Sequence, residues 1–223
     1  MSWDVCLFDL DGTLTDSEPG VTNGIIHALA SFDLPAPGSH ELRKYLGPPL
    51  WFSFREYAGF RDSDLSKVVE IYRDYYHEKG QFENSVFTGM TEVLAALVQS
   101  GKRIAVATSK VESSALSILN HFALLDYFET VVGADELGVV RGSKGLVITE
   151  ALSRLQISSK ENVVMIGDRE HDVHGAAENE IQSIGVLWGY GGQVELETAG
   201  VHHLVESPQE LHHLLLVNAE TIS

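Results

Sequence analysis

Several residue types are scarce in this 223-residue chain, and each scarcity excludes a class of protein. Cys6 is the single cysteine, so no disulfide can form within the chain, and we expect a reducing compartment, the cytoplasm. Lys and Arg number 15 against 32 Asp and Glu, a formal net charge of −17, so the basic surface typical of nucleic-acid-binding proteins is lacking. No apolar run approaches ~18 residues, so we expect no membrane span, and the first residues lack a signal-peptide pattern.

Short apolar runs of strand length alternate with longer helical patterns through most of the chain. The predicted strands are residues 5–8, 103–107, 130–133, 162–166, 183–187 and, with a weaker pattern, 203–205. The predicted helices are residues 90–99, 112–120, 144–155, 172–179 and 208–216. Buried strands that alternate with helices are typical of an α/β fold, so the sequence predicts a doubly wound parallel sheet.

One interval, residues 16–85, interrupts this alternation. A crossover between parallel strands needs about a dozen residues, and long structureless loops are uncommon in compact domains, so this interval is predicted to fold by itself. Its pattern is helical, with one helix beginning near Pro19 and another near Asp62, and with turns at 34–38 and 47–49. The predicted organisation is a core domain of residues 1–15 and 86–223 and an inserted helical cap domain of residues 16–85.

Two carboxylates follow the first predicted strand directly. Asp9 and Asp11 flank Leu10, and Gly12 comes next. Open α/β sheets bind their ligands at the carboxyl edge of the strands, where these residues leave the sheet. Two carboxylates this close together fit a site that needs a nucleophile, a proton carrier and oxygen ligands for a metal ion.

Three more polar segments follow strands that end at the same predicted edge. Thr108 and Ser109 come after the second strand and ahead of a helix, where free N–H groups and hydroxyls bind phosphate. Lys144 begins the helix after the third strand and offers a positive charge to a phosphate group. Asp168 and Asp172 follow the fourth strand at a sharp turn. Because the whole chain is acidic, an anionic substrate would depend on such local basic groups and on a bound cation.

The order of these segments, DLDGTLTDSEPG, then ATSK, Lys144 and GDREHD, resembles the haloacid dehalogenase superfamily in its phosphatase branch. The place of the inserted interval resembles members with an α-helical cap after the first motif, such as phosphoglycolate phosphatases. The resemblance implies a Rossmann-like core, Mg²⁺ as cofactor and a small phosphorylated metabolite as substrate. Two positions depart from the family pattern, Gly145 where many relatives have Pro and Arg169 where many have Thr, and we interpret both as variation between branches.

The resemblance also implies a role for each motif residue. Asp9 would be the nucleophile that forms an aspartyl phosphate, and Asp11 would protonate the leaving alcohol and then activate water. Lys144 would neutralise the charge of Asp9 and of the phosphoryl group. The residues implied in phosphate binding are Asp11, Gly12, Thr108, Ser109 and Lys144. The residues implied in Mg²⁺ binding are Asp9, Asp11 through its backbone carbonyl, Asp168 and Asp172.

Several activities fit these motifs. A phosphatase acting on 2-phosphoglycolate is the first hypothesis, followed by one acting on a nucleoside monophosphate or pyrophosphate. A β-phosphoglucomutase-like phosphotransferase would return the phosphoryl group to a sugar; Thr13 favours the phosphatase, since the mutases usually have Val at that position. A non-catalytic binding protein is least favoured, because Asp9, Asp11, Lys144 and Asp168 are all present. The sequence is compatible with a monomer or a homodimer.

Overall fold

A computed structural model describes residues 3–46, 50–135 and 140–216 of the chain. The turn predicted at residues 47–49 lies outside these described residues. The elements, with η marking a 3₁₀ helix, are β1 (Val5–Phe8), β2 (Thr15–Asp16), α1 (Glu18–Ala30), α2 (Ser39–Leu42), η1 (Arg43–Tyr45), α3 (Leu50–Glu56), α4 (Asp62–Glu78), η2 (Gly80–Phe82), β3 (Ser85–Val86), α5 (Met90–Gln99), β4 (Arg103–Val111), α6 (Glu112–His121), η3 (Leu125–Tyr127), β5 (Thr130–Ala134), α7 (Lys144–Arg154), β6 (Val163–Gly167), α8 (Glu170–Glu178), β7 (Gln182–Val186), α9 (Gln193–Thr198), β8 (His203–Val205) and α10 (Pro208–Leu216).

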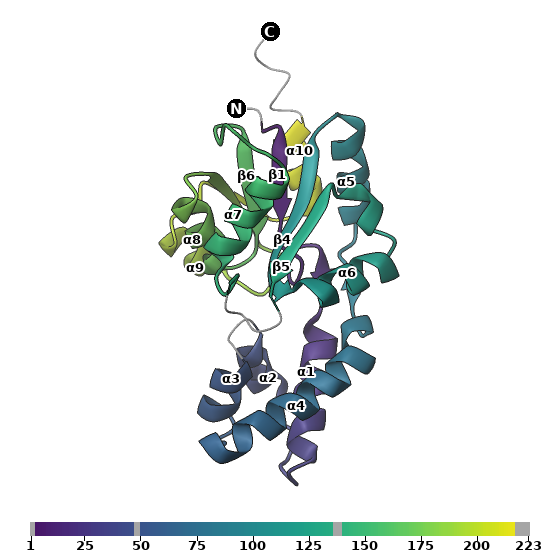
Figure 1. Ribbon diagram of the computed structural model, residues 1–223, viewed down its shortest axis with the longest axis vertical. Helices are drawn as coiled ribbons and strands as arrows, with labels where there is room; N and C mark the ends of the chain where they lie inside the picture. Colours follow the sequence, from purple (N-terminus) through teal and green to yellow (C-terminus); the bar gives the residue numbers. More distant parts are fainter. Residues whose placement is uncertain (1–2, 47–49, 136–139, 217–223) are drawn as a thin grey trace. The chain divides into compact units, whose positions relative to one another are not determined.

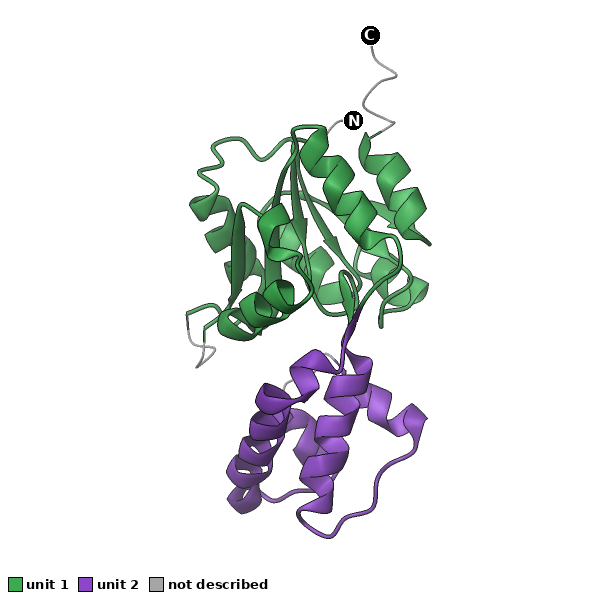
Figure 2. Ribbon diagram, turned by 90° about the vertical axis from the view of Figure 1, so that its right-hand side faces the viewer, with its two compact units in different colours: residues 1–16, 86–223 green, residues 17–85 purple. Residues whose placement is uncertain are grey.

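The chain divides into two compact units (Figure 2). Unit 1 comprises Met1–Asp16 and Val86–Ser223, and unit 2 comprises Ser17–Ser85. The first predicted boundary lies one residue earlier, before Asp16, and the second predicted boundary lies at the same position, after Ser85. Unit 2 is helical, as predicted, and the proposal that it acts as a cap stays a prediction.

The sheet of unit 1 confirms the predicted α/β fold. Its strand order is β5-β4-β1-β6-β7-β8, and each neighbouring pair is parallel. β1 lies between β4 and β6, with Phe8 opposite Val106 on one side and Ile166 on the other. The first, second and fourth of the predicted strands are therefore neighbours, and the loops that follow them start beside one another.

Helices cover both faces of this sheet (Figure 1). Cys6 and Phe8 of β1 pack in one apolar cluster with α5, α6 and α10, whereas Val5 and Leu7 pack in another with α7 and α8. Because both faces of β1 are covered, all four of its residues are buried and the strand is continuously apolar rather than alternating. The apolar run that precedes Asp9 is thus explained by its central place in the sheet.

Unit 2 has an apolar core of its own. Ile25 of α1, Phe54 of α3 and Val68 of α4 are all inaccessible to solvent and belong to one cluster. The helix predicted near Pro19 begins at Glu18, and the one predicted near Asp62 begins at Asp62 itself. The short helices α2 and α3 were not predicted, because runs of four and seven residues are too short to show a helical period clearly.

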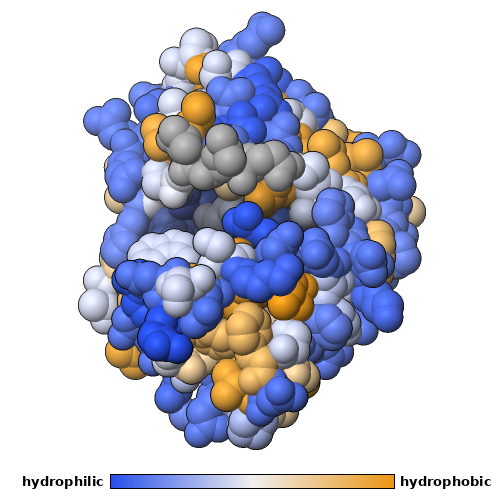
Figure 3. All heavy atoms as spheres, turned by 60° about the horizontal axis from the view of Figure 1, so that its bottom comes forward, coloured by the Kyte–Doolittle hydropathy of each residue, from blue (hydrophilic) through white to orange (hydrophobic). Residues whose placement is uncertain are grey.

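Hydrophilic side chains cover much of the face seen in Figure 3, with apolar side chains in small groups between them. Among the described residues, every helix is too short or too polar to cross a bilayer.

Candidate active site

The acidic loops after β1 and β6 lie side by side because these strands are neighbours in the sheet. The Asp9 N–H donates a hydrogen bond of 2.9 Å to the Ile166 carbonyl, which continues the β1–β6 ladder to the first residue of the loop. Asp168 follows Gly167, the last residue of β6. One carboxylate oxygen from each of Asp9, Asp168 and Asp172 lies within 4.8 Å of the other two, and all three residues are buried. The structure thus brings together three of the four predicted metal-binding residues through their side chains.

Asp172 reaches this cluster from the first turn of α8. Its Oδ2 accepts a hydrogen bond of 3.1 Å from the Arg169 N–H, an N-terminal capping arrangement that starts the helix at Glu170, two residues earlier than predicted. Gly167 leaves room for this carboxylate, since a Cβ at position 167 would overlap with it. The capping role and the closeness to Asp9 therefore arise from one side-chain position.

Lys144 is the cation of the cluster. Its Nζ lies 2.8 Å from Asp9 Oδ1 and 2.7 Å from Asp172 Oδ1, and it donates a hydrogen bond of 3.0 Å to the Ala107 carbonyl. Burial opposes the charge on Lys144, but the carboxylates of Asp172 and Asp9 outweigh burial and raise the pKa of the ammonium group. Lys144 is therefore charged at neutral pH and links the loop after β1 to the start of α8.

Asp168 is completely buried and has no basic partner at ion-pair distance within the described part of the chain. Its Oδ2 accepts a hydrogen bond of 2.7 Å from the Tyr190 N–H, and its Oδ1 accepts one of 3.3 Å from the Thr13 hydroxyl. Burial, followed by the charges of Asp172 and Asp9, raises the pKa of Asp168 to about 8. Burial also raises the pKa of Asp172, to about 6.

The loop after β7 closes around Asp168. The Trp188 indole N–H donates a hydrogen bond of 3.1 Å to the Thr13 carbonyl, and the Tyr190 hydroxyl donates one of 3.1 Å to Asp16 Oδ1. Glycines stand at 189 and 191, where a Cβ would overlap with the backbone or side chain of Asp168. This contact was not predicted from the sequence, although the glycine-rich run 189–192 after the fifth predicted strand indicates a close approach of the backbone there.

Asp11 sits on the same loop as Asp9 but outside the three-carboxylate cluster. Its Oδ2 lies 2.9 Å from Lys110 Nζ, and the side chain keeps 27% of its exposure. Its Oδ1 is buried and has no hydrogen-bond partner among the described residues. Lys110 is a further candidate functional residue that the sequence analysis did not select, although it stands one position after the Thr108–Ser109 pair.

The segment containing Thr108 and Ser109 differs from the prediction. We expected the hydroxyl pair to follow the strand and precede the helix that begins at Glu112, but β4 continues through both residues to Val111. Thr108 is buried, and its hydroxyl accepts a hydrogen bond of 3.2 Å from the Lys110 N–H, whereas Ser109 is exposed. The predicted helix start at Glu112 is confirmed, but the strand runs four residues past its predicted end at Ala107. Both hydroxyls therefore lie in an irregular stretch of β4 beside Ala107, whose carbonyl binds Lys144.

Gly12 is held in a left-handed backbone conformation directly against Asp168. Its φ is +81°, and a Cβ built there would lie 2.6 Å from Asp168 Cγ and closer still to Oδ2. Gly12→Ala is therefore expected to destabilise the protein through both strain and overlap, by about 2–4 kcal/mol in total. The measurement is the free energy of unfolding from urea denaturation.

Gly101→Ala is the matched control for this prediction. Gly101 has nearly the same φ, +80°, but no atom lies within 4 Å of the Cβ that would be added. That variant carries the backbone strain alone, about 1 kcal/mol. Equal destabilisation by the two variants would contradict the close approach of Gly12 to Asp168.

Comparisons with known proteins agree with the order of these elements. The sequence model of the haloacid dehalogenase-like hydrolase family matches residues 6–186. A curated protein of Pseudomonas aeruginosa named 5′-nucleotidase is 40% identical over 190 residues, which cover 85% of each chain. A crystal structure from Clostridium acetobutylicum, described as a predicted phosphatase, superposes with a TM-score of 0.88 at 41% identity and covers 97% of this chain and 100% of the other.

Another relative carries a different activity in its name. The tyrosine-protein kinase PtkA of Mycobacterium tuberculosis is 43% identical over 185 residues, which cover 83% of this chain. The match spans only 62% of the length of that relative. These two relatives, named a 5′-nucleotidase and a tyrosine-protein kinase, each match more than four fifths of this chain. On the evidence of the family match and these identities, the chain belongs to the haloacid dehalogenase-like hydrolases.

Proposed function

We propose that the protein is a Mg²⁺-dependent phosphatase that hydrolyses a small phosphomonoester through an aspartyl phosphate on Asp9. The observation that carries this proposal is the buried bridge from Lys144 to both Asp9 and Asp172, beside Asp168. This bridge gives the Asp9 carboxylate a fixed orientation and a neighbouring positive charge. A nucleophile that attacks an anionic phosphoryl group needs both. The phosphatase and nucleotidase names among the relatives support the same chemistry.

The acidic cluster fits a divalent cation. Asp9, Asp168 and Asp172 carry three negative charges when ionised, and Lys144 offsets one of them. The remaining net charge of about −2 would be balanced by one Mg²⁺. All the side-chain donors in the cluster are carboxylate oxygens, which Mg²⁺ prefers. We propose these three carboxylates as its ligands, joined by the backbone carbonyl of Asp11. When bound, the ion would supply positive charge beside the phosphoryl oxygens.

The residues of the chain would share the two displacements as follows. Asp9 Oδ attacks phosphorus while the ester P–O bond breaks, and Asp11 donates a proton to the departing oxygen to give an alcohol. Water then attacks the aspartyl phosphate, Asp11 accepts the water proton, and inorganic phosphate leaves Asp9. Lys144, Gly12, Thr108 and Ser109 are proposed to hold the phosphoryl oxygens through the ammonium, backbone and hydroxyl groups.

For the substrate, we propose a small phosphorylated metabolite: 2-phosphoglycolate, a nucleoside monophosphate or pyrophosphate. The 40% identity to a protein named 5′-nucleotidase favours the nucleotide within this group. We also propose a cytoplasmic location and no nucleic-acid or membrane partner, on the grounds of charge and composition given above. A monomer or a homodimer is the proposed oligomeric state.

A second candidate function is transfer of the phosphoryl group from Asp9 to another hydroxyl instead of to water. The relative named a tyrosine-protein kinase, at 43% identity, favours a protein hydroxyl as acceptor, and the sequence analysis kept a sugar acceptor open. The two functions share the first displacement and differ only in the second. They are therefore separated by what becomes of the phosphoryl group.

The test is a screen of purified protein with Mg²⁺ against a panel of phosphometabolites, with inorganic phosphate as the readout. We expect phosphate release from at least one monoester and from a chromogenic aryl phosphate, and we expect EDTA to abolish both. Transfer of label from a nucleotide to tyrosine without release of phosphate would favour the kinase function. Absence of both reactions across the panel would contradict an enzymatic role.

A further inference from the structure

The pairing of Asp11 with Lys110 is asymmetric between the two carboxylate oxygens. Oδ2 lies 2.9 Å from Lys110 Nζ, whereas Oδ1 is buried and has no hydrogen-bond partner in the described part of the chain. Lys110 is itself well covered, with 11% of its side chain exposed. An unpaired buried carboxylate oxygen is costly, so such an oxygen is often reserved for a ligand or a reacting group.

The backbone explains how Lys110 reaches Asp11. Ala107 pairs with Val132 of β5 and Val111 pairs with Ala134, so three residues of β4 stand opposite the single residue Gly133. Such a bulge changes the direction in which side chains leave a strand, and bulges are common beside active sites. The Lys110 N–H donates a hydrogen bond of 3.2 Å to Thr108 Oγ1 within this bulge. A Cβ at Gly133 would lie 2.4 Å from the Lys110 carbonyl oxygen, so glycine leaves room for the bulged backbone.

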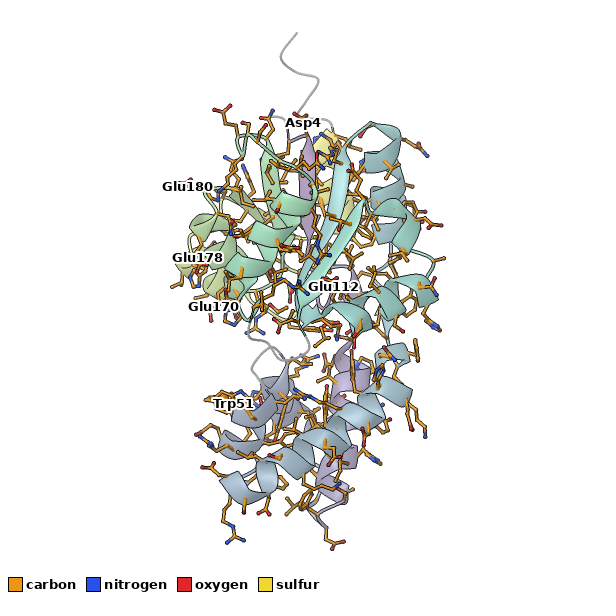
Figure 4. All side chains as sticks on the ribbon, in the orientation of Figure 1. Asp4, Trp51, Glu112, Glu170, Glu178 and Glu180 are labelled. Atoms are coloured by element: carbon orange, nitrogen blue, oxygen red, sulfur yellow. The ribbon has the colours of Figure 1, made fainter. Side chains whose placement is uncertain are left out.

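The end of the bulge is anchored by charge as well. Glu112, the first residue of α6, accepts a hydrogen bond of 3.2 Å from the Gly133 N–H and pairs with Arg154 at 3.1 Å and with Arg141 at 3.3 Å. Figure 4 shows Glu112 and Glu170 at the end of the unit opposite Asp4, which precedes β1. Lys110 is thus fixed on both sides of the bulge, at the edge where the acidic loops begin.

We propose that Lys110 is the positioning residue for proton transfer by Asp11, a step that rests on the proposed function. Lys110 engages Oδ2 and keeps the carboxylate in one orientation, so that Oδ1 is the oxygen that carries the proton. In the first displacement the proton passes from Oδ1 to the ester oxygen, which keeps the electron pair of the broken P–O bond. In the second displacement Oδ1 takes a proton from the attacking water. Lys110 contacts Asp11 and not the substrate.

Leaving groups of different basicity test this role. An alkyl phosphate releases a strongly basic oxygen that needs a proton, whereas a nitrophenyl phosphate releases a stable phenolate that does not. The ratio kcat/KM reports the first displacement only, up to the formation of the aspartyl phosphate. We expect Lys110→Met to lower kcat/KM for the alkyl ester by about 10- to 100-fold and for the nitrophenyl ester by less than about threefold.

Two controls accompany the variant. Lys67→Met changes the net charge equally at an exposed pair with Glu70 and is expected to leave both esters unaffected. In an Asp11→Asn background, Lys110→Met is expected to cause no further loss of kcat/KM for either ester, because the carboxylate that Lys110 orients is absent. Melting temperatures within about 3 °C of the unaltered protein exclude unfolding as the cause of the losses.

The outcomes separate this inference from the proposed function. Equal losses for both esters, or a rise in KM alone, would show that Lys110 binds the substrate and would overturn the positioning role. No loss for the alkyl ester would also overturn it. In either case the unaltered protein still hydrolyses both esters, and the proposed function stands. Failure of the unaltered protein on both esters would contradict the proposed function, and the positioning role with it.

Discussion

Phosphatase turnover is expected to fall by about 10⁴-fold or more when Asp9 is replaced by Asn. The amide keeps the size of the side chain but lacks the anionic oxygen that would form the bond to phosphorus. The other two carboxylates of the cluster, Asp168 and Asp172, are less exposed than Asp9, at 0% and 2% against 8%, and are the proposed ligands of the metal ion. The measurement is initial-rate kinetics with Mg²⁺ and the best ester from the panel.

Asp4→Asn provides a matched control, because Asp4 stands just before β1 and Asp9 just after it. Asp4 Oδ2 accepts a hydrogen bond of 2.9 Å from the Asn162 amide, which can be kept by the new amide after it reorients. The control makes the same chemical change at the other end of one strand and is expected to retain full turnover. Full activity in Asp9→Asn would refute Asp9 as the nucleophile.

Asp9→Asn also has a physical signature that does not depend on turnover. Lys144 loses one of its two carboxylate partners but keeps Asp172 at 2.7 Å, so its charge remains paired. The repulsion among three buried carboxylates decreases at the same time. We therefore expect the variant to fold with a melting temperature close to that of the unaltered protein, so that loss of turnover can be assigned to chemistry.

The sheet and its acidic edge could be predicted because they depend on patterns that are local in sequence. Continuous apolar runs marked the central strands, and the polar residues after them had to meet once those strands lay parallel. Asp9, Asp168 and Asp172 were brought together for this reason. Their closeness follows from strand order, with β1 directly beside β6. The phosphate and catalytic roles assigned to individual residues stay predictions.

The contacts that orient the site could not be predicted, because they depend on departures from regular structure. The ion pair between Lys110 and Asp11 requires a bulge in β4 opposite Gly133. The hydrophobic pattern of a sequence does not show where a strand contains extra residues. The bond from Tyr190 to Asp168 depends on how a loop turns after β7. The predicted strand end at Ala107 was wrong for the same cause: the bulge extends β4 to Val111, past the point where its apolar pattern ends.

Asp168→Asn is expected to affect stability and activity in opposite directions. Burial and the charges of Asp172 and Asp9 raise the pKa of Asp168 to about 8 from an ordinary value of 3.8. Between these two values the folded, metal-free protein holds a proton that the unfolded chain releases. The contribution of Asp168 to the free energy of unfolding therefore decreases as pH rises from about 4 to about 8, since this group binds its proton more tightly in the folded state.

Asn at position 168 removes this dependence, because an amide does not ionise. Its carbonyl oxygen can still accept the hydrogen bond from the Tyr190 N–H. We expect the metal-free variant to match the unaltered protein near pH 4 and to melt several degrees higher at pH 8, at about 2–4 °C per kcal/mol. Thermal denaturation in EDTA across this pH range measures the effect, with Asp126→Asn, an exposed carboxylate of η3, as the control.

With Mg²⁺ present, we expect the unaltered protein to melt at a higher temperature than Asp168→Asn at pH 8, the reverse of the order without metal. An ion that binds only the folded state stabilises it by about 2.7 kcal/mol at a concentration 100 times its dissociation constant, which raises the melting temperature by about 5–10 °C. The unaltered protein should show this rise at pH 8 and Asp168→Asn should not, while its turnover falls by about 10²-fold or more. An equal rise in melting temperature for the unaltered protein and for Asp168→Asn would show that Mg²⁺ binds away from Asp168. The same buried charge that weakens the metal-free fold is then the source of its affinity for a divalent cation, because proton and metal ion compete for one carboxylate.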